Sequence, residues 1–158
     1  TRYPVGWGGA GVVHTSNGNY YTSVSIETAN ASAVLCIETG AMLEAHKFNE
    51  KVTHCMCLVR KDEKSPYQIL SPCGICQERL RYWGEDVQVA VTTEEEKIKF
   101  VQLKELQPYH WTKAYPAEEL EHWNEQVRRT SSSHRGTAHG AILAFTLLGK
   151  GFGYVFVY

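Results

Sequence analysis

The first half of the chain switches between strand-like and helix-like patterns of apolar residues. Two strand-like runs flank Ser16-Asn17-Gly18-Asn19, and Asn-Gly is a strong signal for a tight turn, so residues 5–26 are predicted to form a β-hairpin. Apolar residues at helical spacing follow Ser32 and predict a helix over residues 32–48. Residues 52–60 then alternate as a strand, which residues 67–70 are expected to continue as a hairpin.

The second half continues the alternation. Pro72 suits the start of a helix, because its missing N–H costs nothing there, and a helix is predicted over residues 73–83. Strands are expected over 88–92 and 99–106, followed by a charged helix over 116–129. Helices alternating with strands predict an α/β fold, a three-layer α/β/α domain with a mixed five-stranded sheet.

Composition adds one division to this picture. The chain has 158 residues, which corresponds to about one domain. Residues 130–158 contain no Asp or Glu and include an apolar run, Ala141 to Leu148. We therefore assign residues 1–129 to a folded domain and residues 130–158 to a C-terminal tail, which is either a docking segment or an appended, non-native stretch.

Charge and hydropathy exclude two classes of partner. The formal net charge is -1, from 16 basic and 17 acidic residues, whereas proteins that bind nucleic-acid polymers usually carry a basic excess. No apolar stretch reaches the roughly 18 residues of a membrane-spanning helix, so no membrane partner is expected. Five cysteines without a visible leader segment fit a reducing compartment, and we expect a cytoplasmic protein.

The chemistry is carried by four residues, Cys36, Glu38, Cys73 and Cys76. Each of these three cysteines is predicted near the start of a helix, where the helix dipole and free backbone N–H groups stabilise a thiolate. Three thiolates are soft ligands for Zn²⁺ and leave a fourth tetrahedral position open, as in catalytic zinc sites. Glu38, two residues after Cys36, is placed to exchange protons with water at that open position.

This pattern resembles that of the zinc-dependent cytidine deaminases. Cys36-Ile37-Glu38 followed by Pro72-Cys73-Gly74-Ile75-Cys76 is similar to the three-cysteine version of the family signature, and blasticidin S deaminases share it. The resemblance continues at Tyr3 to Gly6, at Ser25-Ile26-Glu27 and at Leu106 to Tyr109. It implies the cytidine deaminase-like fold, with Cys36, Cys73 and Cys76 as zinc ligands and Glu38 as the catalytic residue.

The resemblance also implies how a substrate is bound. Glu27 would bind the ribose hydroxyls, Ser25 stands where relatives have Asn, and the substrate-binding set is Glu27, Ser25, Tyr3 and Tyr109. The implied reaction is hydrolytic deamination of cytidine, deoxycytidine or a related aminated pyrimidine nucleoside, in pyrimidine salvage. The implied assembly is a homo-oligomer, a tetramer or dimer, in which the segment with Tyr109 reaches a neighbouring subunit's site.

Two alternatives stay open. Ser25, and Thr39 in place of the Arg that often follows the catalytic Glu, leave a blasticidin S-type nucleoside antibiotic as a possible substrate. The second alternative is a non-catalytic, zinc-stabilised interaction module, in which Cys55 or Cys57 would supply the fourth protein ligand of a structural zinc site. Against it, a structural site has no use for Glu38, and the strand spacing of Cys55 and Cys57 favours burial in the core.

Overall fold

The computed structural model describes residues 8–26, 28–62, 64–94, 96–123 and 125. They belong to two compact units, 1–108 and 109–158, and each unit is described by itself. The predicted division after residue 129 falls among residues 126–158, which lie outside the described residues, so it stays a prediction.

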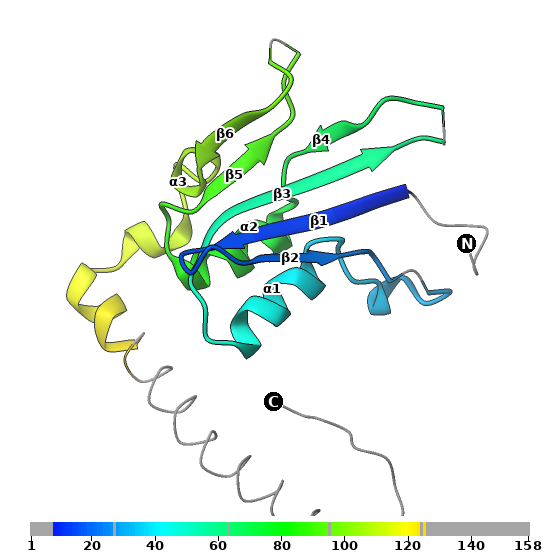
Figure 1. Ribbon diagram of the computed structural model, residues 1–158. Helices are drawn as coiled ribbons and strands as arrows, with labels where there is room; N and C mark the ends of the chain where they lie inside the picture. Colours follow the sequence, from blue (N-terminus) through cyan, green and yellow to red (C-terminus); the bar gives the residue numbers. More distant parts are fainter. Residues whose placement is uncertain (1–7, 27, 63, 95, 124, 126–158) are drawn as a thin grey trace, which may run out of the picture. The chain divides into compact units, whose positions relative to one another are not determined.

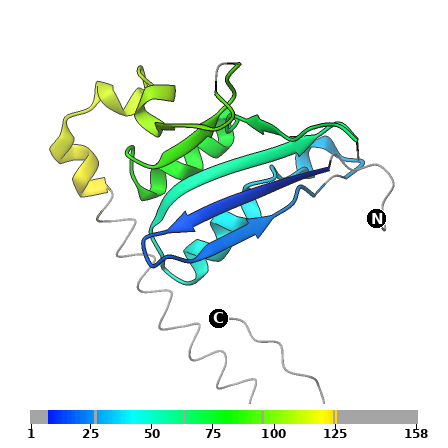
Figure 2. The same cartoon turned by 45° about the horizontal axis from the view of Figure 1, so that its top comes forward.

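The first unit is built on a mixed β-sheet (Figure 1; Figure 2). Its strands are β1 (Gly8–Thr15), β2 (Tyr20–Ser23), β3 (Val52–Arg60), β4 (Gln68–Leu70), β5 (Gln88–Val91) and β6 (Lys99–Gln102). They lie in the order β2-β1-β3-β5-β6, with β4 paired to β3. Only the β3–β5 pair is parallel among these described strands. The predicted α/β class and mixed sheet are confirmed, with six strands because β4 and β5 pair with successive parts of β3.

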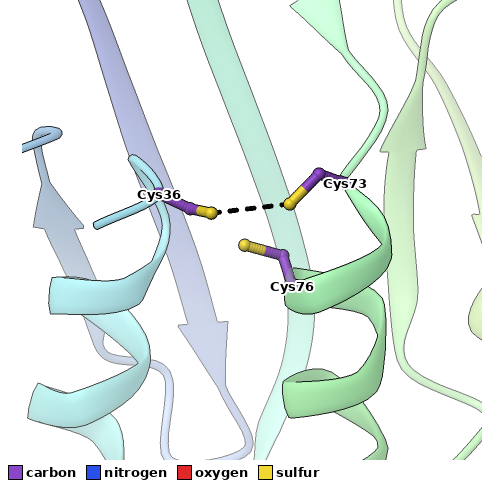
Figure 3. Close-up of side chains that lie close together, drawn as sticks. All are labelled: Cys36, Cys73 and Cys76. Atoms are coloured by element: carbon purple, nitrogen blue, oxygen red, sulfur yellow. Dashed lines mark hydrogen bonds between the residues drawn. The ribbon is translucent and has the colours of Figure 1, made fainter. Parts of the chain in front are cut away.

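Two helices pack against this sheet, α1 (Thr39–Lys47) and α2 (Gly74–Leu80). Both lie in front of β1 and β3, on the same face (Figure 3). Shorter helical segments are η1 (Ala31–Ala33), η2 (Arg81–Trp83), α3 (Leu103–Leu106) and, in the second unit, η3 (Trp111–Ala114). None of the described helices is long and apolar enough to cross a membrane.

The core lies between the helices and this face of the sheet. Successive strand residues point to opposite faces, so alternate residues of β1 and β3 are buried under the helices. The buried cluster includes Val13, Ala41, Met42, Ala45, Cys55, Cys76, Leu80 and Val89. The opposite face carries Val12, His14 and Met56, all partly exposed.

The predicted start of the first helix, at Ser32, is wrong. The Asn30 side chain accepts a hydrogen bond from the Ser32 N–H and caps the short η1 turn instead. The chain then extends, and Leu35 forms a β-bridge with Ile26, so the helix cannot begin before Thr39. Cys36 therefore lies in an extended segment ahead of α1 and not within its first turns.

The last two predicted elements are partly right. The strand predicted over 99–106 ends at Gln102, because the Glu105 carboxylate accepts a hydrogen bond from the Gln102 N–H at 2.8 Å and starts α3. Of the helix predicted over 116–129, residues 117–123 and 125 are helical, and the remainder lies outside the described residues.

Candidate active site

The structure brings the three predicted cysteine ligands together (Figure 3). Cys36 comes from the extended segment before α1, Cys73 is the N-cap of α2, and Cys76 lies in its first turn. Their sulfur atoms all lie within 4.8 Å of one another, and the Cys36 and Cys73 sulfurs are 3.5 Å apart. Among the residues that the structure describes, they are the one such group of three or more potential metal ligands.

The three thiols differ in acidity. Burial raises the pKa of Cys73, but hydrogen bonds from the backbone N–H groups of Cys76 and Ile75, together with those of the two neighbouring thiols, bring this pKa below its ordinary value. Burial raises the pKa of Cys36, and its hydrogen bond with Cys73 adds to the rise. Cys73 is therefore the thiol that gives up its proton most readily in the metal-free site.

Glu38 lies against the same group. Its side chain is 5% exposed, and its Oε2 atom accepts a hydrogen bond from the Cys76 thiol at 3.3 Å. Burial raises the pKa of Cys76, and the adjacent Glu38 carboxylate raises it further. The rise reflects repulsion between a Cys76 thiolate and the Glu38 carboxylate. A cation bound by the three sulfurs would offset this repulsion, because its positive charge attracts both groups.

The segment 36–38 is seated by close backbone packing on β1. A Cβ on Gly11 would lie 2.7 Å from the Glu38 Cα and 2.9 Å from the Ile37 carbonyl oxygen, so a larger residue cannot fit. The Ser23 hydroxyl, at the end of β2, donates a hydrogen bond to the same carbonyl oxygen. A glycine within a strand is itself a sign of close backbone approach, whereas nothing in the sequence pointed to Ser23.

The proposed substrate-binding residues are only partly described. Ser25 is half-buried and precedes Ile26, whose bridge to Leu35 places it beside the segment that leads to Cys36. Tyr109 begins the second unit, where its side chain is 95% exposed. Tyr3 and Glu27 lie outside the described residues.

The three-cysteine group has the dimensions of a zinc site. Sulfurs at about 2.3 Å from a tetrahedral Zn²⁺ lie roughly 3.8 Å from one another, close to the separations found here. Three cysteine sulfurs form a donor set that zinc favours, and the fourth position is left for water or substrate. Cys36, Cys73 and Cys76 could therefore hold Zn²⁺ as a catalytic ion.

Cys55 and Cys57 are core residues, as predicted. Cys57 is 4% exposed, and burial with the nearby Glu38 carboxylate raises the pKa of Cys57 to about 12. Cys55 is 2% exposed, and burial raises its pKa strongly as well. Neither belongs to the group of potential ligands among the described residues, so the fourth protein ligand that a structural zinc site needs is not supplied by them.

Comparisons with known proteins agree with this geometry. No protein-family model matches the chain, and no curated protein matches it. Among solved structures, the cytidine deaminase from Bacillus anthracis is 56% identical in sequence, with a TM-score of 0.71, over 78% of this chain and 88% of that one.

More distant structures share the fold alone. The cytidine deaminase from Burkholderia pseudomallei is 16% identical, with a TM-score of 0.53, over 65% of this chain and 80% of that one. The cytidine deaminase from Mycobacterium tuberculosis is 18% identical, with a TM-score of 0.52, over 65% of this chain and 77% of that one. With a 56% identical relative matched over most of its length and a three-cysteine group beside a buried glutamate, the chain belongs to the cytidine deaminase family.

Proposed function

We propose that this protein is a zinc-dependent hydrolase that deaminates cytidine, deoxycytidine or a related aminated pyrimidine nucleoside. The products are the corresponding uridine and ammonia. The observation that carries the proposal is the buried Glu38 carboxylate, 3.3 Å from one sulfur of the three-cysteine group. The 56% identity to a cytidine deaminase supports the substrate class.

Cys36, Cys73 and Cys76 would hold the ion. Zn²⁺ at this position would act as a Lewis acid and make water nucleophilic at neutral pH. The three sulfurs come from two segments, so the ion would also join the start of α1 to the start of α2.

Glu38 would move the protons. Its carboxylate accepts a proton from the attacking water and delivers it to ring N3 as the hydroxide adds at C4. It then accepts the proton of the added hydroxyl and passes it to the amine, so that the C4–N bond breaks and ammonia leaves. The burial of Glu38 and the packing of its backbone on Gly11 would hold the carboxylate in one position through these transfers. Such positioning is what makes a single group effective for several proton transfers.

The remaining roles follow from the family resemblance. Glu27 would bind the ribose hydroxyls with Ser25 beside it, and Tyr3 and Tyr109 would complete the nucleoside pocket. Tyr109 would act at a neighbouring subunit's site within a homo-oligomer, a tetramer or dimer. We propose a role in pyrimidine salvage in the cytoplasm.

The proposal is tested by measuring ammonia release from cytidine, deoxycytidine, N4-substituted cytidines and blasticidin S. We expect turnover of a free nucleoside, and Glu38→Gln should lose about 10²–10⁴-fold in kcat because it cannot transfer protons. Glu44→Gln, on the same helix and further from the cysteines, is the matched control and should keep its activity.

Three results would contradict the proposal in different ways. Turnover of blasticidin S alone would move the substrate to nucleoside antibiotics. Wild-type activity in Glu38→Gln would remove the proton-transfer role. A zinc-loaded protein that releases no ammonia from any of these compounds would favour a zinc-stabilised interaction module.

A further inference from the structure

Arg79 links the two segments that carry the cysteine ligands. It lies in the last turn of α2, one turn beyond Cys76, and its Nη1 atom donates a hydrogen bond to the Thr39 hydroxyl at 2.8 Å. Thr39 is the first residue of α1 and directly follows Glu38, and it is 6% exposed. The bond therefore connects the segment of Cys36 and Glu38 to the helix of Cys73 and Cys76, whose helix starts lie side by side in Figure 3.

The charge of Arg79 is unusual for this position. Within the described part of the chain, Arg79 forms no ion pair with a carboxylate, whereas Arg81 forms one with Glu85 at 3.5 Å. A cation at the start of α1 faces the positive end of that helix, which is normally unfavourable. The hydrogen bond to Thr39 therefore holds the guanidinium in a place that its charge does not favour.

We propose that Arg79 is a positioning residue of the metal centre. Through Thr39 it fixes the distance between the two ligand-bearing segments. This inference rests on the proposed zinc site, and it adds a residue that contacts neither the ion nor the substrate. Groups that orient metal ligands from outside the coordination sphere typically contribute about 10–100-fold to metal affinity.

The test is zinc affinity, measured by competition with a chromogenic chelator on the full chain. We expect Arg79→Ala to weaken zinc binding about 10–100-fold. Thr39→Val keeps the shape of Thr39 and removes the acceptor, so it should weaken binding in the same direction. If both changes act through one hydrogen bond, the double variant should bind zinc no more weakly than Arg79→Ala alone.

Two further variants separate charge from geometry. Arg79→Lys keeps the charge but not the planar guanidinium, so it should recover part of the affinity. Arg81→Ala removes an arginine from the adjoining η2 segment, where its hydrogen bonds go to Gln107 and Glu85, and it should leave zinc affinity unchanged.

A purely structural role for Arg79 predicts a different result. Arg79 could merely complement the C-terminal end of α2, in which case Arg79→Ala would lower the Tm of the metal-free protein and leave zinc affinity as in the wild type. That result would overturn the inference, and so would a wild-type protein that binds no zinc. A protein with Arg79-dependent zinc binding that deaminates none of the tested compounds would overturn the proposed function and leave the inference standing.

Discussion

Five cysteines in one chain have different chemistry because their surroundings differ. Cys73 is exposed and has a lowered pKa, whereas Cys57 is buried and has a pKa raised to about 12. The pKa of Cys76 is raised as well, so position and not acidity separates Cys57 from the candidate ligands: Cys57 lies outside the three-cysteine group. Residue type alone does not tell the candidate ligand Cys73 from the core residue Cys57.

Removing one ligand should therefore remove the metal. We expect about one zinc ion per chain in the purified protein, and Cys73→Ala should lose most of it because two sulfurs do not complete the site. Cys57→Ala is the matched control and should keep its zinc, since it removes a buried thiol outside the ligand group. Metal analysis by mass spectrometry decides the outcome, and full zinc content in Cys73→Ala would refute the ligand assignment.

At the scale of elements, the site depends on how closely β1 approaches the segment before α1. Gly11 allows contact between two backbones, and the Ser23 hydroxyl satisfies the Ile37 carbonyl at the same point. Glu38 and Cys36 flank Ile37, so this contact orients both functional side chains at once.

Gly11→Ala should break this packing. The added methyl group would lie within 3.0 Å of three backbone atoms of residues 37 and 38, which cannot move aside as a flexible side chain would. We expect a loss of about 1–3 kcal/mol in the free energy of unfolding, typical of overpacking, together with a fall in kcat. Chemical denaturation and the ammonia assay measure the two effects.

Gly8→Ala is the control on the same strand. A Cβ on Gly8 would meet the Arg60 side chain at 3.5 Å, an ordinary van der Waals contact. Stability and activity should stay near those of the wild type. If Gly11→Ala had the same stability and activity as Gly8→Ala, the close packing of residues 36–38 on β1 would not be needed for function.

At the scale of the whole molecule, the outer surface of the helical layer is unusually apolar. Leu43 on α1, Ile75 on α2 and Tyr82 on η2 are 58%, 59% and 55% exposed. The Tyr82 ring contacts His46 of α1 at 5.1 Å between ring centroids, so α1 and η2 are in contact here. Exposed apolar side chains are common at protein interfaces, and we expect the proposed homo-oligomer to bury these three.

Sedimentation at micromolar concentration tests the assembly. The wild type should sediment as a dimer or tetramer, and Tyr82→Glu should shift it towards a smaller species because it places a charge in the interface. Tyr67→Glu alters a similarly exposed tyrosine just before β4 and should leave the mass unchanged. A wild-type monomer that still deaminates cytidine would show that no shared site is needed.

The tail is tested in the same measurement. Deleting residues 130–158 should lower solubility or shift the mass if the tail is a docking segment. If it is an appended stretch, the shortened protein should behave as the wild type does. These residues lie outside those that the structure describes.

Much of the fold and the ligand group could be predicted because their signals are local. Residues along β1 and β3 are alternately buried because successive side chains of a strand point to opposite faces. The Asn-Gly turn predicted the hairpin of β1 and β2. Cys36, Glu38, Cys73 and Cys76 were recognisable because zinc chemistry needs these residue types at restricted spacings.

Tertiary contacts decided the rest. The helix predicted from Ser32 begins at Thr39, because a β-bridge with Ile26 holds Leu35 outside a helix, and spacing within the segment could not reveal a partner nine residues away. Likewise Arg79 and Thr39 are 40 residues apart, and neither carries a local signal. The sequence by itself determined which groups are the candidates for binding a metal and moving protons. Only the packing of α1, α2 and β1 decided how closely these groups lie, because that depends on distances between segments remote along the chain.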